Sequence, residues 1–232
     1  GLGAFDIAGI QYLYGPNRGH NIEDDYYFLD QDLDGFMSIW DGGGIDTIDA
    51  SYSNSLVTID LRNATLENEV GGGGFISQVD DEYKGYTIAY NSTGDAIIEN
   101  AKGSNYNDLI IGNEYNNIIE GIGGNDLIFS SYGDDFIFGD EGLDKVSYDD
   151  SIDQYGFELD TSTGGFSVSS DSQGYLDYLF GIESLIFDEL DYYFPSDIAL
   201  SQTSFNEGTS IGSNLADISA YDQDIEDDFD EN

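Results

Sequence analysis

Carboxylate and amide side chains recur every nine residues between Gly103 and Ser147. Written in rows of nine, this segment reads GSNYNDLII, GNEYNNIIE, GIGGNDLIF, SSYGDDFIF and GDEGLDKVS. The sixth residue of each row is in turn Asp108, Asn117, Asp126, Asp135 and Asp144. Calcium in proteins takes about six to eight oxygen ligands, from carboxylates and from backbone carbonyls. The spacing therefore indicates a series of calcium sites.

Two further columns of residue types run in phase with the carboxylates. The first residue is Gly in every row except one, where it is Ser130, and small residues there permit tight turns that direct carbonyls to a shared point. The eighth residue is always a β-branched aliphatic suited to a thin core: Ile110, Ile119, Ile128, Ile137 and Val146. The alternative is a solvated, disordered Gly-rich loop. The aliphatic column favours a parallel β-roll, because a disordered segment has no reason to place Ile at every ninth residue.

A two-sided roll uses two rows for each coil, so stacked carboxylates should lie eighteen residues apart. Asp108, Asp126 and Asp144 are then expected in one column. Glu99, Asn117 and Asp135 are expected in the other. We expect the first column to bind calcium more tightly, because neutral Asn117 removes a charge from the second.

These rows resemble RTX repeats, whose consensus is GGxGxDxUx. The resemblance implies that carbonyl oxygens at the first and third positions complete the calcium sites. On this sequence those positions are Gly103, Asn105, Gly121, Gly123, Ser130, Tyr132, Gly139 and Glu141.

Upstream segments resemble the calcium-binding half of serralysin-type zinc metalloproteases. Residues 38–51, SIWDGGGIDTIDAS, are similar to that family's IWDAGGNDTIDAS. The match implies a calcium site formed by Asp41, Gly43, Gly44 and Asp46; a Gly-rich hairpin turn is the alternative. AIIENAKGSNYNDLIIGN is similar to VTIENAIGGSGNDVLIGN, which implies a carboxylate ligand at Glu99 and a carbonyl ligand at Ile97. The family's upstream ligand loop is poorly matched, and Asp24 is the nearest candidate there.

A catalytic site is not expected in this chain. It has one histidine, His20, no cysteine, and neither an HExxH nor a GxSxG motif. The first motif is needed for a zinc protease of this kind, and the second marks one type of serine nucleophile. Carboxylate pairs are too numerous to identify a general acid and base.

The net charge of −43, from 48 acidic and five basic residues, opposes binding to nucleic acid or to an anionic membrane. The same charge opposes compaction, so we expect folding and calcium binding to be coupled. Calcium would also take the place of the disulfides that a chain without cysteine cannot form. No apolar run is long enough to span a bilayer.

The remaining segments predict elements around the roll. Residues 1–20 form a docking helix and linker, with Ile7, Ile10 and Leu13 at helical spacing before Gly15 and Pro16. The helix resembles the DIAAIQxLYGAN helix of serralysin-type proteases. Residues 21–102 supply strands and the first calcium site, 103–147 the roll, and 148–194 a cap with a hairpin at 164–165, ending in the D-x-L-x-G-x-E-x-L-x-F-x-D pattern seen after RTX arrays.

Residues 195–232 resemble the start of a cadherin-like β-sandwich repeat, with an acidic disordered tail as the alternative. The resemblance implies calcium ligands at Glu207, Asp222 and Asp224.

Taken together, the sequence predicts an all-β protein: a calcium-binding parallel β-roll with flanking strands, a capping hairpin, a short N-terminal helix and the start of a sandwich module. The predicted function is a calcium-binding structural or adhesive module of a secreted or cell-surface RTX protein, exported by a type I system. Its partners would be neighbouring modules or other copies. The alternative is the non-catalytic half of a serralysin-type zinc metalloprotease.

Overall fold

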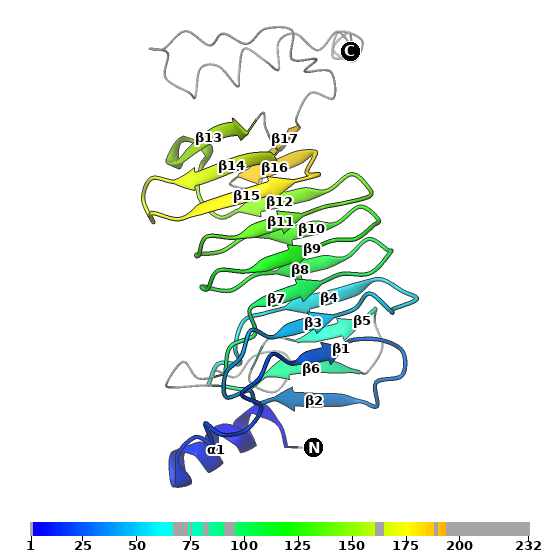
Figure 1. Cartoon of the computed structure of the whole chain (residues 1–232), viewed down its shortest axis with the longest axis vertical. Coiled ribbons are helices and arrows are strands. Elements are labelled where there is room, and N and C mark those ends of the chain that lie inside the picture. The colour runs from blue at the N-terminus through cyan, green and yellow to red at the C-terminus, as the bar shows by residue number, and fades with distance from the viewer. Residues whose placement is uncertain are drawn as a thin grey trace, which may run out of the picture.

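Short strands separated by Gly- and Asp-rich turns coil into a parallel β-roll in this computed structural model (Figure 1). The structure describes residues 2–66, 74, 76–80, 84–90, 96–160, 165–187 and 190–193, with only the backbone given for residues 160 and 190–193. Each coil gives one strand to each of two sheets, as the nine-residue rows predict. The all-β fold class, the roll and the capping hairpin are thereby confirmed.

Within the described residues, sheet A has eight strands and sheet B has nine. In order across sheet A they are β1 (Tyr26–Phe28), β3 (Thr47–Asp49), β7 (Asn100–Lys102), β9 (Ile118–Glu120), β11 (Phe136–Phe138), β15 (Leu176–Phe180), β14 (Gly165–Ser170) and β13 (Tyr155–Asp160). In order across sheet B they are β17 (Leu190–Tyr193), β16 (Ser184–Phe187), β12 (Lys145–Tyr148), β10 (Leu127–Phe129), β8 (Leu109–Ile111), β4 (Val57–Asp60), β5 (Ser77–Val79), β6 (Gly85–Ile88) and β2 (Phe36–Ile39).

The register of the stacked strands is the eighteen-residue offset expected from the rows. Ile110 pairs with Ile128 and Ile128 with Val146 in sheet B, while Ile119 pairs with Ile137 in sheet A. The side chains of all five eighth-position residues are fully buried between the sheets. The turns need glycine at the fourth position of the last three rows, because Gly124, Gly133 and Gly142 have φ of 106°, 109° and 152°.

The D-x-L-x-G-x-E-x-L segment that follows the rows adds one more coil. Leu179 pairs in parallel with Ile137, and Leu185 pairs in parallel with Val146. The antiparallel strands β13 and β14 then extend sheet A beyond β15. Phe187 stacks on Tyr148 at 5.3 Å between ring centroids and closes the end of the core.

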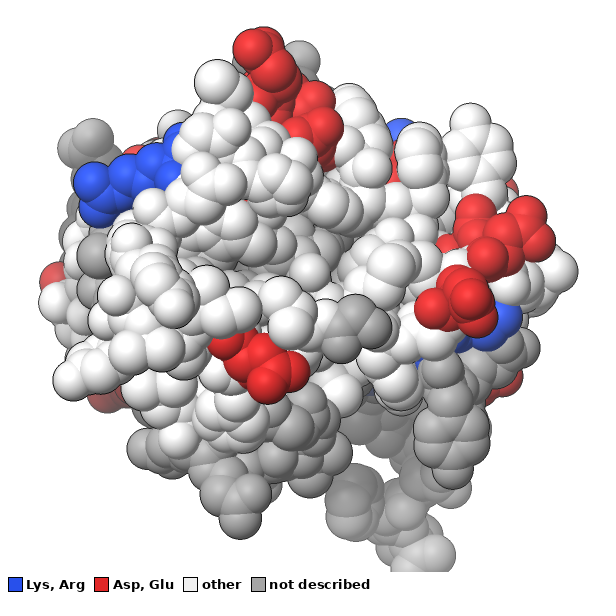
Figure 2. Space-filling model, turned by 90° about the horizontal axis from the view of Figure 1, so that it is seen from below, with Lys and Arg blue, Asp and Glu red and all other residues white. Residues whose placement is uncertain are grey.

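Helix α1 (Ala4–Tyr14) forms where the sequence predicts it, at the opposite end of the roll from the cap (Figure 1). Ile10 and Leu13 are 44% and 70% exposed, so the docking of this helix stays a prediction. Seen from that end, the surface shows separate patches of acidic side chains on a mostly uncharged background (Figure 2). No helix among the described residues has the length and apolar character needed to cross a membrane.

The aliphatic column provides a direct test of the fold. Ile119 is fully buried, whereas its neighbour Ile118 points outward and is 45% exposed. We expect Ile119→Ala to lower the free energy of unfolding by about 2–5 kcal/mol, since it leaves a cavity in a thin core. Ile118→Ala should cost less than about 1 kcal/mol. Urea unfolding with calcium present would measure both, and similar losses would contradict the two-sided roll.

Candidate metal centres

The B column consists of Asp108, Asp126 and Asp144, each placed directly before a strand of sheet B. A ladder of hydrogen bonds runs along it, because each backbone N–H donates to the carboxylate one coil further on. The N–H of Asp108 donates to Oδ1 of Asp126, and the N–H of Asp126 donates to Oδ1 of Asp144, both at 2.8 Å. Glu183, in the cap, accepts the N–H of Asp144 at 2.7 Å. The ladder thus fixes Asp126 and Asp144 by one oxygen each, whereas both oxygens of Asp108 accept hydrogen bonds from Ser104.

In two of these carboxylates the ladder leaves the second oxygen without a donor. Oδ2 of Asp126 and of Asp144 is buried and has no hydrogen-bond partner among the residues that the structure describes. A buried acceptor without a donor is costly, and such atoms in native proteins call for an unseen ion or water.

These spare oxygens face the first-position glycines. A Cβ added to Gly121 would collide with Oδ2 of Asp126 and would lie 2.8 Å from the carbonyl oxygen of Gly139. A Cβ added to Gly103 would lie 2.8 Å from Oδ2 of Asp108 and 2.6 Å from the carbonyl oxygen of Gly121. The carboxylate of one row and the carbonyl of the next coil therefore converge on one point. A side chain at these first positions would clash with the converging oxygens, so glycine is required there.

Other predicted carbonyl positions stack beside these glycines. Gly123 and Glu141 form a parallel bridge, and the N–H of Gly124 donates to the carbonyl of Glu141 at 2.9 Å. The Cβ position of Gly123 also lies 3.9 Å from the side-chain oxygen of Asn105.

The A column runs along the other edge of the roll. It contains Asp25, Asp46, Glu99, Asn117, Asp135 and Asp177. The N–H of Asp46 donates to Oε2 of Glu99 at 2.8 Å, and the N–H of Asn117 donates to Oδ1 of Asp135 at 2.8 Å. The side-chain amide of Asn117 donates at 2.8 Å to the carbonyl oxygen of Glu99 and at 2.9 Å to Oδ1 of Asn113. Protein hydrogen bonds thus surround this neutral member.

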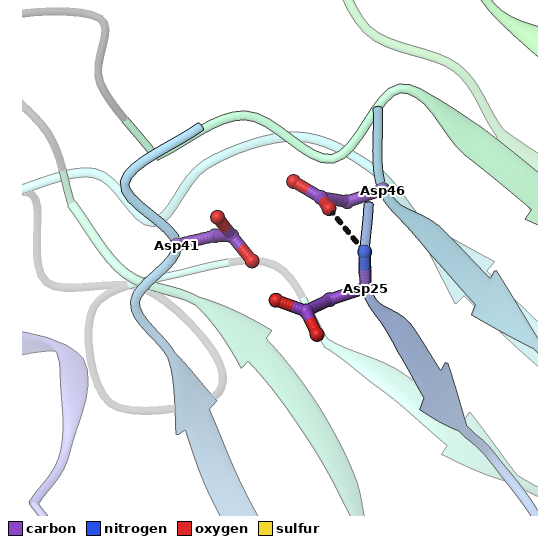
Figure 3. A group of neighbouring side chains, drawn as sticks. All are labelled: Asp25, Asp41 and Asp46. Carbon is purple, nitrogen blue, oxygen red and sulfur yellow. Dashed lines mark hydrogen bonds between the residues drawn. The ribbon is translucent and has the colours of Figure 1, made fainter. Parts of the chain in front are cut away.

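A separate cluster of three carboxylates lies at the start of the A column. Asp25, Asp41 and Asp46 turn towards one another (Figure 3), and each offers an oxygen within 4.8 Å of the other two. The N–H of Asp25 donates to Oδ1 of Asp46 at 2.8 Å, and Oδ2 of Asp46 is buried with no partner in the described part of the chain.

Gly43 and Gly44 shape the loop that carries Asp41 and Asp46. Their φ values are 138° and 150°, which glycine adopts readily. A Cβ on Gly44 would collide with the carbonyl oxygen of Glu23 and would lie 2.8 Å from Oδ1 of Asp46. The N–H of Gly43 and the hydroxyl of Tyr27 donate to Asp41 at 3.0 and 2.5 Å.

Sequence reasoning missed Asp25, and named Asp24 as the nearest upstream candidate. The structure shows that Oδ1 of Asp24 accepts the N–H of Ile45 at 2.9 Å, while the Asp25 carboxylate joins the cluster. Asp25 directly precedes β1, as Asp46 precedes β3, so the strand boundary was the available signal. Asp177 and Glu183 were likewise noted in a cap motif but not as members of the columns.

Burial disfavours the ionised form of these carboxyl groups when no cation is bound. It raises the pKa of Asp126 to about 8, and repulsion by the carboxylates of Asp108 and Asp144 adds to the increase. Burial and the charge of Asp177 raise the pKa of Asp135 to about 8. Burial also raises the pKa of Asp46 to about 7 and that of Asp144 to about 6.

The donor set selects the kind of metal. In the described centres the ligand atoms are carboxylate and carbonyl oxygens, which suit calcium, magnesium or manganese rather than metals that prefer sulfur or imidazole. Several backbone carbonyls in an adaptable loop favour calcium over magnesium, which demands a stricter octahedron. The residues therefore fit calcium.

The predicted set of calcium ligands stays a prediction. No described contact brings Ile97 to a metal centre, and Glu207, Asp222 and Asp224 lie outside the described residues. Ser130 carries a side chain where the B column has glycine, and its hydroxyl donates to Oδ2 of Asp177 at 2.8 Å.

Comparisons with known proteins agree with this assignment. The protein-family model for the RTX calcium-binding nonapeptide repeat matches residues 102–131, 111–146 and 120–155. The chain is 36% identical to serralysin from Proteus mirabilis over 119 residues, which is 45% of this chain and 21% of that protein. It is 37% identical over 118 residues to metalloprotease AprA from Pseudomonas entomophila, covering 46% of this chain and 21% of the relative.

The match to serralysin C from Dickeya chrysanthemi is similar, at 33% identity over 119 residues, 46% of this chain and 22% of that protein. The matched part thus spans about a fifth of the length of these relatives. The repeat match, the two-sided roll and the buried carboxylate columns together show that the chain contains RTX calcium-binding nonapeptide repeats, and it is similar to serralysins over its repeat region.

Proposed function

We propose that this chain is a structural module of a secreted protein, folded and stiffened by calcium and used for adhesion at a cell surface. The observation that supports it most is the B column, where buried carboxylate oxygens without partners in the described chain face glycine carbonyls. Each bound calcium would cancel two charges in a chain of net charge −43. Calcium would also link consecutive coils, so binding free energy would become folding free energy.

Secretion through a type I exporter follows from the resemblance to RTX proteins. A chain this acidic would stay unfolded where calcium is scarce and would fold where calcium is plentiful. The cadherin-like reading of residues 195–232, with Glu207, Asp222 and Asp224 as ligands, supports a string of modules stiffened by calcium. Neighbouring modules or other copies would then be the partners.

The similarity to named metalloproteases favours a second candidate, the non-catalytic half of a zinc protease. It rests on the 36% identity to serralysin and on the DIAGIQYLYG helix at the N-terminal end. The complete gene decides between the two, since an HExxHxxGxxH motif upstream of this segment would favour the protease and its absence there would favour a purely structural protein.

A calcium titration followed by far-ultraviolet circular dichroism tests the calcium dependence directly. We expect strand signal to develop cooperatively at about 0.1–1 mM calcium, as for extracellular modules, and to disappear on addition of EGTA. Magnesium at equal concentration is the control and should have little effect. At pH 8 or above, where protons no longer neutralise the buried carboxyl groups, a spectrum that is equally folded in EGTA would refute the proposal.

The B column is tested by Asp126→Asn, which keeps the size of the side chain but removes its charge. We expect the calcium concentration at the folding midpoint to rise about tenfold or more, because a direct ligand is weakened. Asp149→Asn is the matched control, since Asp149 is exposed and carries the same charge. Equal effects of both variants would show that overall charge, and not the column, governs folding.

Protons should compete with calcium for these sites. The pKa of Asp126 is about 8 in the metal-free fold against an ordinary value of 3.8, so the folded state binds more protons between these values. The metal-free roll should therefore be most stable near pH 4 and lose that stability as pH rises to about 8. Calcium needs the ionised form, so its affinity should increase over the same range.

Circular dichroism in EGTA and calcium titrations at pH 6 and pH 8 would measure the two trends. In Asp126→Asn, which lacks one titrating group, the dependence on pH should be weaker. A metal-free roll that becomes more stable as pH rises would contradict the burial of these carboxyl groups.

A further inference from the structure

Tyr27 links the cluster of Asp25, Asp41 and Asp46 (Figure 3) to the core of the roll. It is the central residue of β1, and its half-buried ring packs against the core. The ring also meets that of Tyr86 edge-on, with the centroids 6.0 Å apart. The Tyr27 hydroxyl donates to Oδ2 of Asp41 at 2.5 Å. The packing of the ring therefore fixes the position of a donor at the cluster.

Asp41 is a fully buried carboxylate that two donors hold in place. The N–H of Gly43 donates to its Oδ1 at 3.0 Å, and the Tyr27 hydroxyl donates to its Oδ2. An ionised carboxylate has about four lone-pair sites, so each oxygen can accept a hydrogen bond and still bind a cation. The need for a cation comes from Asp46, whose buried Oδ2 has no partner in the described part of the chain. Tyr27 thus orients one carboxylate beside another that lacks a donor.

The Tyr27 hydroxyl also accepts a hydrogen bond from the segment between α1 and β1. The side-chain amide of Asn21 in that segment donates to it at 2.9 Å. The same segment is bonded to the loop that begins at Asp41, because the N–H of Gly42 donates to the carbonyl of His20 at 2.9 Å. The loop of the cluster, β1 and the segment that follows α1 therefore meet at one hydroxyl.

Trp40 provides a local signal for this arrangement. It directly precedes Asp41 and is the one tryptophan in the sequence. Its indole N–H donates to the carbonyl of Asn17 at 2.9 Å, so its surroundings depend on how the segment after α1 lies against the loop. Tryptophan fluorescence therefore reports on this corner of the molecule alone.

We propose that Tyr27 is a positioning residue for calcium at the cluster of Asp25, Asp41 and Asp46, and that its hydroxyl couples the ion to the segment that carries α1. The inference rests on the proposed calcium binding and deepens it, because it gives a residue that is not a ligand control over the affinity of one site. Outer-shell partners of metal ligands typically contribute about 10–100-fold to metal affinity. Calcium at this cluster then orders the connection between α1 and the roll.

Tyr27→Phe in the full chain tests the positioning role, because it removes the hydroxyl and keeps the ring. Calcium chloride titrations at pH 8 or above would be followed by Trp40 fluorescence for the cluster and by far-ultraviolet circular dichroism for the whole roll. We expect the calcium midpoint of the Trp40 signal to rise about tenfold relative to the midpoint of the strand signal. The ratio of the two midpoints is the measured quantity, so a general loss of stability does not imitate the effect.

Tyr86→Phe is the matched control. Tyr86 is buried, packs on the Tyr27 ring and donates its hydroxyl to the carbonyl of Phe28 at 3.0 Å instead of to a carboxylate of the cluster. The substitution removes a tyrosine hydroxyl and its hydrogen bond, as Tyr27→Phe does, but leaves Asp41 with both donors. The ratio of the two midpoints should stay that of the wild type.

The outcomes separate this inference from the function on which it rests. The same ratio in Tyr27→Phe and Tyr86→Phe would overturn the positioning role and leave calcium binding intact. A Trp40 signal that ignores calcium while the strand signal develops would overturn the coupling, again without affecting calcium binding by the roll. A wild-type chain in which neither signal responds to calcium would overturn the proposed function together with this inference.

Asn21→Gly keeps the proposal testable if Tyr27→Phe does not fold. Asn21 has φ of 45°, which glycine adopts readily, so the change removes the side-chain amide without straining the backbone. The Trp40 midpoint should rise relative to the strand midpoint, by less than about tenfold, because the Tyr27 hydroxyl keeps Asp41 but loses the donor that orients it. An unchanged ratio in Asn21→Gly would contradict the coupling of the ion to this segment.

Discussion

The roll depends on the burial of carboxylates next to other carboxylates. Asp108, Asp126 and Asp144 stack one coil apart, and each is removed from water by the coils around it. Hydrogen bonds satisfy one oxygen of Asp126 and of Asp144 and both oxygens of Asp108, but they cannot neutralise a charge. A proton or a cation must do that, and only a cation does it while the group stays ionised. This electrostatic requirement is the basis of the proposal that calcium binding and folding are coupled.

The thin core explains why the roll needs this arrangement. Each row contributes one fully buried aliphatic, such as Ile128 or Ile137, between two sheets of very short strands. So narrow a core buries little apolar surface for each residue that must be ordered. Cross-links between coils have to supply the remaining stability. In the absence of cysteine, the hydrogen-bond ladders and the metal centres are the cross-links available.

The repeat could be predicted from sequence because its period encodes position directly. A nine-residue row fixes which residue turns inward, which faces the edge and which residue stacks on which, so Ile119 and Ile137 could be paired without coordinates. Prediction failed where the period changes. Asp177 and Glu183 are only six residues apart, and Asp25 could not be told from Asp24 until the start of β1 was known. The exposure of α1 depends on contacts that no local pattern encodes.

The buried carboxylates of the roll are satisfied in two different ways. On both edges some keep an oxygen without a donor among the described residues, as Asp126 and Asp135 do. Others are held by protein donors, as Asp108 and Asp177 are. Asp126 meets a glycine with no side chain, and its Oδ2 has no donor among the described residues. Asp177 meets the hydroxyls of Ser130 and Tyr148, so the chain satisfies it internally and at any calcium concentration. The contact around Asp177 lies beside the stacked rings of Tyr148 and Phe187, at the cap end of the described core. Protein donors can therefore hold the Asp177 carboxylate by themselves, whereas a buried carboxylate with a spare oxygen, such as Asp126, calls for a cation or a proton.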